Sequence, residues 1–497
     1  MWAMSVEDTG SIRASWVAAA LSATDRPHPI TVATLLGLFV MAKLPALSTP
    51  YYWDEAAAYV TPALWLAEEG LRHALPGGHP PTRFFGHPPG IYLALAAIYR
   101  TFGHSIWITH AVAVGLATVS LFLTFRVGQM IAGPAAGLLA ALLLVLSPLF
   151  FAQAGLLHGD MTVTALGLCA TLFYLQGRTR LYLVAAIALV LCKETGVAIV
   201  AAISAHHLAF RRERPRRARE AVLLALPALA LVAFFVVTWM ATGRLLNNPY
   251  FAEHALADVS VETFRTVSGW LFERQGRWIL VVVTALTVFE PPRLARRRDI
   301  ALMAMLILPY WAAFSVIYFL PRYLLAAFPY VCIIAATAMV ALARRTVLIP
   351  IAALIGLAAI FAREVPGDFD VPGNYETNLG YIDVVHVHAA TARWLESNHA
   401  NARIGAAWPL SMDLSRPALG YVAKPLHVVH VEDGREDVEL LAWTAQGGPE
   451  NHAILTRARA EQWHLLERFG QGAKVAVVFA PPAKSGRAAR AAPPPDS

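Results

Sequence analysis

The chain has 497 residues, of which 57% are hydrophobic and 15% charged, and its mean hydropathy is +0.52. Soluble domains have about 45–50% apolar and about 25% charged residues, so this composition excludes an ordinary soluble protein. The formal net charge of +7 does not indicate nucleic-acid binding, because the basic residues cluster in short loops between apolar runs. The three cysteines lie inside apolar runs and form neither a disulfide framework nor a zinc motif.

The N-terminal part predicts one retained span followed by a loop with two surface helices. Residues 1–27 are a predicted cytoplasmic tail, and the first span covers Pro29–Leu47 without a small-residue cleavage site after it. The following loop contains two apolar stretches, Ala56–Leu71 and Gly90–Phe102, that are short for a membrane crossing. We expect both to form juxtamembrane helices at the membrane interface.

The remaining apolar runs predict a transmembrane domain over residues 28–362, with about eleven spans in total. The later spans cover Ile106–Val127, Ala132–Phe151, Met161–Leu175, two short spans within Leu181–Phe210, Ala221–Thr242, Trp278–Phe289, Ile300–Phe319, Tyr323–Ala343 and Val347–Phe361. Residues 193–196, Lys-Glu-Thr-Gly, separate the two short spans. A loop of residues 243–277 is also predicted, and loops of this length are often functional.

Charge sets the predicted orientation. With the N-terminus in the cytoplasm and Gly90–Phe102 not crossing, the basic clusters between the spans fall on the cytoplasmic side, as the positive-inside rule requires. These clusters are Arg126, Arg178 with Arg180, residues 211–217, residues 293–298, and Arg344 with Arg345. If Gly90–Phe102 crossed, most of them would lie outside, so the charge bias favours the first arrangement.

The C-terminal region is polar and predicts a small extracytoplasmic α/β domain over residues 363–480. Its predicted helices cover Ile382–Ser397 and Glu450–Phe469, and its predicted strands cover Arg403–Ala407, Leu426–Val431 and Lys474–Phe479. The Pro-, Ala- and Arg-rich residues 481–497 predict a disordered tail. The predicted fold class is thus an all-α polytopic membrane protein with a small soluble α/β domain.

Several ionisable residues gather on the predicted non-cytoplasmic face. They are Asp54, Glu55, His87, Asp160, Lys193, Glu194 and Arg322. Ionisable groups at membrane depth are costly and indicate function. Each also has a structural interpretation: a carboxylate can cap a helix, Lys193 and Glu194 can form an ion pair, and Arg322 can anchor a span end. Their convergence on one face is the stronger signal.

Carboxylates and cations on one face suit transfer from a lipid-phosphate sugar. A carboxylate, Asp54 or Asp160, can take the proton from an attacking hydroxyl. Lys193 and Arg322 can hold the phosphate as it gains negative charge.

The motifs resemble those of C-type glycosyltransferases that use polyprenyl-phosphate sugars, a group with the protein O-mannosyltransferases and the lipid A aminoarabinose transferase. The matching segments are residues 52–56, 86–89, 147–148, 158–160, 193–196 and 321–324. The resemblance covers about the first 340 residues and implies the same fold. The C-terminal domain does not resemble the sugar-recognition modules of eukaryotic protein mannosyltransferases, which argues against a protein acceptor.

The resemblance implies a site. Asp54 becomes the preferred base and Asp160 the second acidic position of the catalytic centre, which helps to place the acceptor or a metal, while Lys193 and Arg322 contact the phosphate. The other expected substrate-binding residues are Glu55, His87, Glu194 and Tyr323. Metal use varies in the family, so a divalent ion on Asp54, Asp160 or His87 stays an open expectation.

The predicted function is therefore an inverting glycosyltransferase in a bacterial plasma membrane, with its site outside the cytoplasm. The expected partners are a polyprenyl-phosphate sugar donor, the lipid bilayer, and an acceptor glycan, lipid or protein, with no nucleic acid. Two alternatives stay open. Intramembrane charges and a broken helix also occur in secondary transporters. A non-catalytic lipid-binding relative in cell-envelope assembly is the other.

Overall fold

The computed structural model describes residues 29–75, 77, 84, 86–210, 216–245, 260–287, 297–366, 376–431 and 436–482. They divide into two compact units. The first contains the described residues of 29–48, 54–366 and 376–379, and the second those of 49–53 and 380–482. The tail predicted for 1–27 and residues 483–497 of the predicted disordered tail lie outside the described residues.

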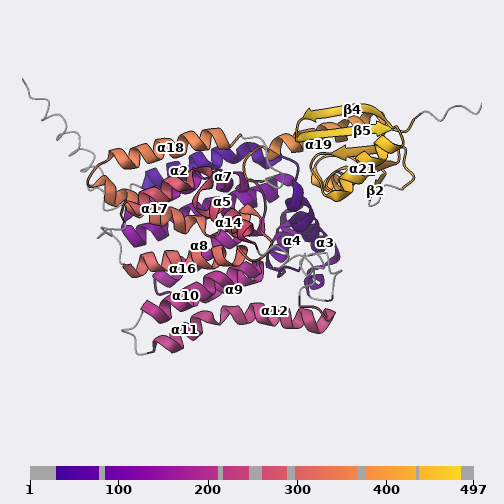
Figure 1. The fold of residues 1–497 in the computed structure, drawn as a ribbon. Coiled ribbons are helices and arrows are strands. Elements are labelled where there is room, and N and C mark those ends of the chain that lie inside the picture. Colours follow the sequence, from indigo (N-terminus) through magenta and orange to yellow (C-terminus); the bar gives the residue numbers. More distant parts are fainter. Residues whose placement is uncertain are drawn as a thin grey trace, which may run out of the picture. The chain divides into compact units, whose positions relative to one another are not determined.

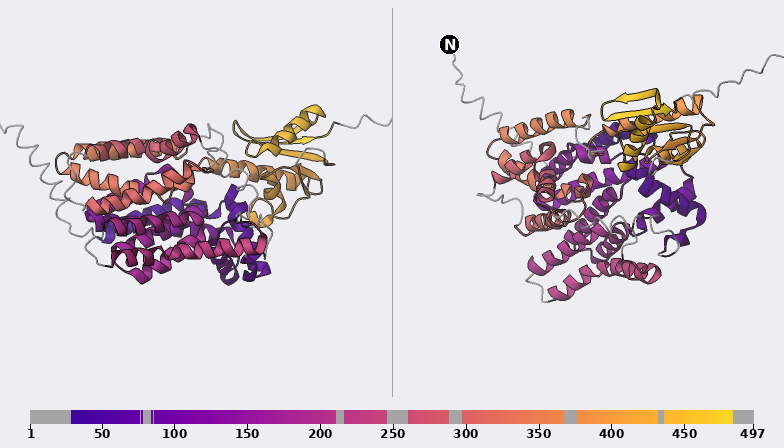
Figure 2. Two further views of the ribbon diagram at one scale, coloured as in Figure 1. Left: turned by 60° about the horizontal axis from the view of Figure 1, so that its bottom comes forward. Right: turned by 45° about the vertical axis from the view of Figure 1, so that its right-hand side comes forward.

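The first unit consists of helices, most of which run alongside one another (Figures 1 and 2). In chain order they are α2 (Pro29–Lys43), η1 (Leu44–Ser48), the π-helix η2 (Glu55–Val60), α3 (Thr61–Glu69), η3 (Leu71–Ala74), α4 (Gly90–Phe102), α5 (Ile106–Ala132), α6 (Pro134–Val145), α7 (Pro148–Gln153), α8 (Gly159–Leu175), α9 (Thr179–Cys192), η4 (Glu194–Gly196), α10 (Val197–Phe210), α11 (Arg217–Ala225), α12 (Pro227–Thr242), α14 (Val261–Phe272), η5 (Arg274–Gly276), α15 (Arg277–Ala285), α16 (Arg297–Phe314), η6 (Pro321–Leu324), α17 (Phe328–Ala343) and α18 (Leu348–Glu364).

Three described stretches are long and apolar enough to cross a membrane, namely Pro29–Ser48, Ile106–Ala132 and Arg217–Thr242. Shorter apolar helices include α4, α6, α8, α9 and α17. The structure thus has the helical, apolar character that the sequence predicts, whereas the count of about eleven spans stays a prediction.

Local sequence explains two differences from the predicted helices. The span predicted for Ala132–Phe151 is divided into α6 and α7, because Ser147 precedes Pro148 and a residue before proline disfavours helical backbone. The segment predicted as a loop over residues 243–277 contains helix α14, whose N-terminus is capped by Ser260 accepting a hydrogen bond from the Thr263 amide. Part of that loop, residues 246–259, lies outside the described residues.

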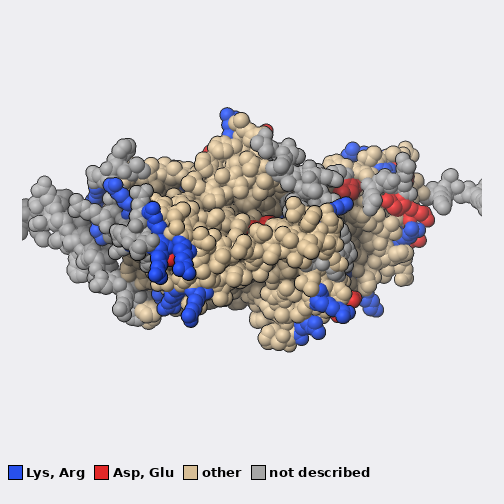
Figure 3. All heavy atoms as spheres, turned by 90° about the horizontal axis from the view of Figure 1, so that it is seen from below, with Lys and Arg blue, Asp and Glu red and all other residues tan. Residues whose placement is uncertain are grey.

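Basic residues and the predicted site lie at opposite ends of the same helices. α8 begins beside Asp160 and ends before Arg178, and α9 ends just before Lys193. α16 begins at Arg297 and α17 ends before Arg344, and Arg322 lies in the segment that joins the other ends of these two helices. Figure 3 shows one group of Lys and Arg toward the left of the view and a second toward its lower right, with few charges on the surface between them.

The second unit is a five-stranded sheet with helices on both faces. Its strands are β1 (Ile404–Ala406), β2 (Val428–His430), β3 (Leu440–Thr444), β4 (His464–Gln471) and β5 (Lys474–Ala480), in the order β2-β1-β3-β5-β4. β1 pairs in parallel with β2 and β3, and the other pairs are antiparallel. Its helices are α19 (Tyr381–Asn398), α20 (Leu410–Ser415), η7 (Pro417–Leu419) and α21 (Pro449–Ala460).

Alternation along β3 places α19 and α21 on opposite faces of the sheet. Leu441 packs in an apolar cluster with Ile454 of α21. Thr444, of the opposite parity, bonds His388 of α19 at 2.9 Å. Asp413 bonds the other ring nitrogen of His388 at 2.8 Å, so this buried polar group has partners on both sides.

One helix prediction in this region was wrong. The helix predicted for Glu450–Phe469 ends at Ala460, and residues 464–471 form strand β4. β4 lies at the edge of the sheet and most of its side chains are exposed, so it lacks the apolar alternation that marks a buried strand.

Candidate functional site

Arg322 is the centre of the candidate site. It lies in the short helix η6, and its side chain is 7% exposed. The guanidinium pairs through Nη2 with Asp54 and through Nη1 with Glu376, and its Nε lies 3.4 Å from Oδ2 of Asp160. One cation therefore faces three carboxylates from segments far apart in the sequence, an arrangement that only the fold creates.

Lys193 is the second cation of the cluster. It stands at the non-helical junction between α9 and η4, and its Nζ lies 2.6 Å from Oδ1 of Asp160. Asp160 lies in the first turn of α8, where the helix dipole favours a negative charge. The ring of Tyr323 lies 4.5 Å from Nζ of Lys193 and 5.5 Å from the Arg322 guanidinium carbon. Asp160 thus bridges two cations that have an aromatic ring beside them.

The exposure of the two predicted acids differs. Asp160 is 4% exposed, whereas Asp54 is 27% exposed. Asp54 immediately precedes the π-helix η2, and π-helical turns occur frequently at functional sites. The residue before it, Trp53, has a φ of 50°, which is strained for a bulky side chain. Asp54 is therefore the acid of the pair that solvent can reach.

Glu376 is a site residue that the sequence did not predict. It lies after the last helix of the first unit, outside every motif, so only its acidity in a polar segment could have marked it. Gln153 donates a hydrogen bond to its backbone oxygen at 2.9 Å, and His158 Nε2 lies 3.6 Å from its Oε1. Burial raises the pKa of Glu376 to about 7, against the opposing effect of Arg322.

His87 and Glu194 form a pair of their own next to Lys193. His87 Nδ1 lies 2.9 Å from Glu194 Oε2. Gly90, at the start of α4, allows this approach, because a Cβ there would lie 2.5 Å from the backbone oxygen of Leu191 in α9. The end of α9 and the start of α4 are therefore packed too closely for any side chain, which brings His87 to η4.

Glu55 does not join the cluster, although it neighbours Asp54 in sequence. Its side chain is fully buried and accepts a hydrogen bond from the Leu157 amide at 2.7 Å. His110 Nε2 lies 3.1 Å from the same carboxylate oxygen. These contacts hold the segment before α8, which carries Asp160, and substrate binding by Glu55 stays a prediction.

The described residues do not contain a group of three His, Cys, Asp or Glu side chains arranged to hold a metal ion. Asp54 and Asp160 instead face Arg322 and Lys193, while His87 pairs with Glu194. Arg322 and Lys193 therefore converge on carboxylates, and both a guanidinium and an ammonium can also bind phosphate oxygens.

A family profile described as "Predicted membrane protein (DUF2079)" matches residues 79–367, more than half of the chain. The chain belongs to this family. No curated protein matches the DUF2079 chain in sequence.

Among solved structures, this DUF2079 protein is similar to ArnT from Cupriavidus metallidurans bound to undecaprenyl phosphate. The TM-score is 0.59 at 15% identity, over 90% of this chain and 97% of ArnT. The apo state of ArnT gives 0.59 at 14% identity, over 90% of this chain and 97% of that chain. The oligosaccharyltransferase AglB from Archaeoglobus fulgidus gives 0.49 at 9%, over 84% of this chain and 69% of that one. The ArnT likeness confirms, for the fold, the resemblance inferred from sequence.

Proposed function

We propose that the protein is an inverting glycosyltransferase that moves a monosaccharide from a polyprenyl-phosphate donor to an acceptor hydroxyl. The observation that carries this proposal is the charge arrangement of the site. Two buried cations, Arg322 and Lys193, converge on Asp160, and the more exposed Asp54 lies beside them on Arg322. The fold shared with ArnT, whose structure holds undecaprenyl phosphate, supports the same donor class.

The donor phosphate binds between Arg322 and Lys193. A guanidinium presents paired N–H donors to phosphate oxygens, and an ammonium adds a compact charge. The carboxylates of Asp54 and Glu376 pair with this guanidinium. Donor binding therefore exchanges carboxylates for a phosphate, with Asp160 keeping both cations in place.

That exchange frees Asp54 to act as the general base. The acceptor hydroxyl gives its proton to the Asp54 carboxylate while its oxygen bonds to the anomeric carbon from the face opposite the phosphate. The bond from the anomeric carbon to the phosphate oxygen breaks, and its electron pair leaves with the lipid phosphate. Arg322 and Lys193 stabilise the charge that develops there. A single displacement inverts the anomeric centre.

The distribution of basic residues supports an orientation in a bacterial plasma membrane. The basic helix ends, such as Arg178, Arg297 and Arg344, face the cytoplasm, and the opposite ends with Arg322 and Lys193 face outward. The site and the C-terminal unit are then extracytoplasmic. The acceptor is a glycan, a lipid or a protein reached from that side.

Kinetics of Arg322→Lys tests the assignment of the donor phosphate site. The substitution keeps the charge but removes the paired donors, so we expect a rise of about tenfold or more in the KM for donor. Arg274→Lys, on an exposed guanidinium of the same unit, is the matched control. An unchanged donor KM in Arg322→Lys, with normal folding, would remove Arg322 from the donor site.

A further inference from the structure

Arg277, at the start of α15, is a buried cation outside the site described above. Its side chain is buried, yet its Nε and Nη2 have no hydrogen-bond partner in the described part of the chain. Its Nη1 lies 3.4 Å from Oε1 of Gln275. Buried polar groups are nearly always hydrogen-bonded, so two unused donors on one guanidinium require an explanation.

Aromatic packing accounts for only part of this environment. The guanidinium carbon lies 4.4 Å from the ring centroid of Phe328 and 5.7 Å from that of Trp270. Such contacts engage the flat face of a guanidinium, whereas its N–H donors lie in the plane. The rings therefore stabilise the charge and leave the Nε and Nη2 donors available to an anion.

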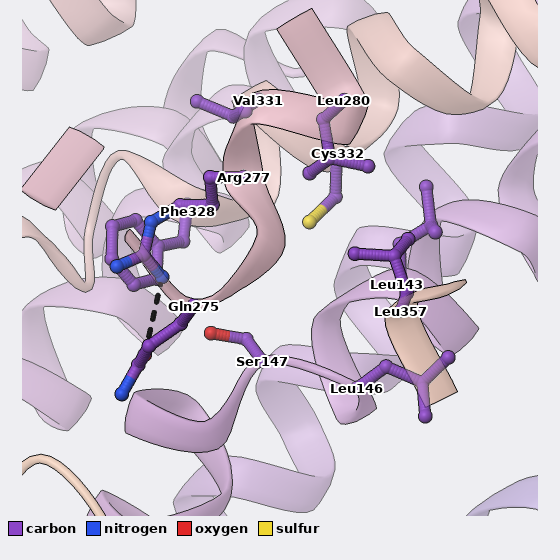
Figure 4. A pocket seen from close by; sticks show the side chains of 10 residues that line it. All are labelled: Leu143, Leu146, Ser147, Gln275, Arg277, Leu280, Phe328, Val331, Cys332 and Leu357. Atoms are coloured by element: carbon purple, nitrogen blue, oxygen red, sulfur yellow. Dashed lines mark hydrogen bonds between the residues drawn. The ribbon is translucent and has the colours of Figure 1, made fainter. Parts of the chain in front are cut away.

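The guanidinium lines a small cavity (Figure 4). The hydroxyl of Ser147, also buried and without a hydrogen-bond partner among the described residues, lines the same cavity. The rest of the wall is mostly apolar and includes Leu143, Leu146 and Leu357. Figure 4 shows the polar atoms of Arg277 and Ser147 on one side and these leucines on the other.

Gln275 also lines the polar side of the cavity, but its uncharged side chain does not balance the charge of Arg277. Its backbone has a φ of 55°, in the left-handed region that side chains rarely adopt. Its side chain accepts a hydrogen bond from the Leu149 amide at 3.1 Å and donates one to the Thr377 oxygen at 3.0 Å. The amide is thus committed to neighbouring segments, and strain of this kind accumulates at binding sites.

The two helices beside the cavity also present apolar surfaces outward. Trp278 and Val282 of α15 are exposed, as are Leu348 and Ile355 of α18. Exposed apolar faces on helices of a membrane protein suit contact with lipid chains. Lipid chains can therefore lie against two helices that also contribute Leu280 and Leu357 to the cavity wall.

We propose that this cavity is a binding site for an amphiphile with a phosphate headgroup, separate from the donor phosphate site at Arg322. Nε and Nη2 of Arg277 bind two oxygens of the headgroup, and the Ser147 hydroxyl donates to a third. The alkyl or isoprenoid chain packs on Leu143, Leu146 and Leu357. The third donor favours a phosphate over a carboxylate, which has only two oxygens.

Photolabelling localises the ligand and separates this site from the one at Arg322. The full-length protein in detergent is labelled with hexadecyl phosphate that carries a diazirine in its chain, and adducts are mapped by peptide mass spectrometry. We expect adducts around Leu143 and Leu357 that unlabelled hexadecyl phosphate competes away. Hexadecanol and inorganic phosphate should compete poorly, because each lacks one half of the amphiphile.

Variants complete the test. Arg277→Gln should weaken the competing affinity of hexadecyl phosphate about tenfold or more, since it removes a charge-assisted pair of hydrogen bonds. Arg274→Gln, which neutralises an exposed arginine nearby, should leave it unchanged. Leu146→Trp should block labelling by filling the apolar part, which keeps the test available if Arg277→Gln does not fold.

Three results would overturn the proposal. The first is equal affinity in Arg277→Gln and the wild type. The second is competition by inorganic phosphate as strong as that by hexadecyl phosphate, which would indicate a free anion. The third is the absence of saturable labelling at the residues that line the cavity. None of these outcomes depends on transferase activity, so the experiment tests this proposal independently of the proposed function.

Discussion

Replacing Glu376 with Gln should change how donor binding depends on pH. Glu376 pairs with Nη1 of Arg322, where the proposed function places the donor phosphate. Burial, together with the nearby Asp54 carboxylate, raises the pKa of Glu376 to about 7, against Arg322. Below that pH the side chain takes up a proton and loses its charge. A phosphate therefore displaces the neutral side chain from Arg322 more easily than it displaces the charged carboxylate.

The size of the effect follows from the pKa. If the donor binds only the form with neutral Glu376, its apparent affinity scales with the neutral fraction. With a pKa of about 7, that fraction is about one tenth at pH 8 and about nine tenths at pH 6. Donor affinity should therefore rise about tenfold from pH 8 to pH 6. Glu376→Gln is permanently neutral, so its affinity should be high and flat over this range.

Equilibrium binding of a polyprenyl-phosphate monosaccharide between pH 6 and pH 8 is the assay. Such a donor is a phosphodiester whose charge is constant over this range. Burial lowers the pKa of His158, so this neighbour stays neutral throughout. Glu273→Gln, at an exposed position, should keep the tenfold change. The reasoning is refuted if Glu376→Gln keeps the wild-type pH dependence, or if the wild type shows none.

Two further predictions concern packing. Gly90→Ala should lower the free energy of unfolding in detergent by about 1–3 kcal/mol, because its Cβ would collide with the backbone of α9. The control is Gly115→Ala, where a Cβ would meet nothing within 4 Å. Equal stability of the two variants would contradict the close packing of α4 on α9. His388→Leu should cost about 1–3 kcal/mol by leaving the buried Asp413 carboxylate without its partner. We expect faster hydrogen exchange in strands β3 and β5 of His388→Leu than in the control His452→Leu, which changes an exposed residue. Equal exchange in the two variants would contradict the prediction.

Sequence predicted best the elements with strong local signals. Helix α4 has the predicted bounds, Gly90–Phe102, because prolines precede it and Gly103 follows it. The break after Cys192 was also predicted, since a charged pair and a glycine interrupt an apolar run. Strand β4 was missed because an exposed edge strand carries little apolar alternation.

The candidate site was predicted in part. Asp54, Asp160, Lys193 and Arg322 belong to motifs, and the structure brings them together. Glu376 could not be found in this way, because its partner lies 54 positions away and its own surroundings contain no pattern. Glu55 also belongs to a motif, but its side chain contacts Leu157 and His110 and not Arg322, so its expected substrate contact stays a prediction.

The measurement that tests the central claim most directly is transfer of radiolabelled sugar from a panel of polyprenyl-phosphate monosaccharides by the purified protein, with acceptor extract present. The wild type should transfer sugar from one of these donors. Asp54→Asn, nearly isosteric and partly exposed, should fold normally and lose at least about a hundredfold in turnover. Near-normal turnover in Asp54→Asn would contradict the assignment of the base. Absence of transfer from every donor, by folded protein, would contradict the proposed reaction itself.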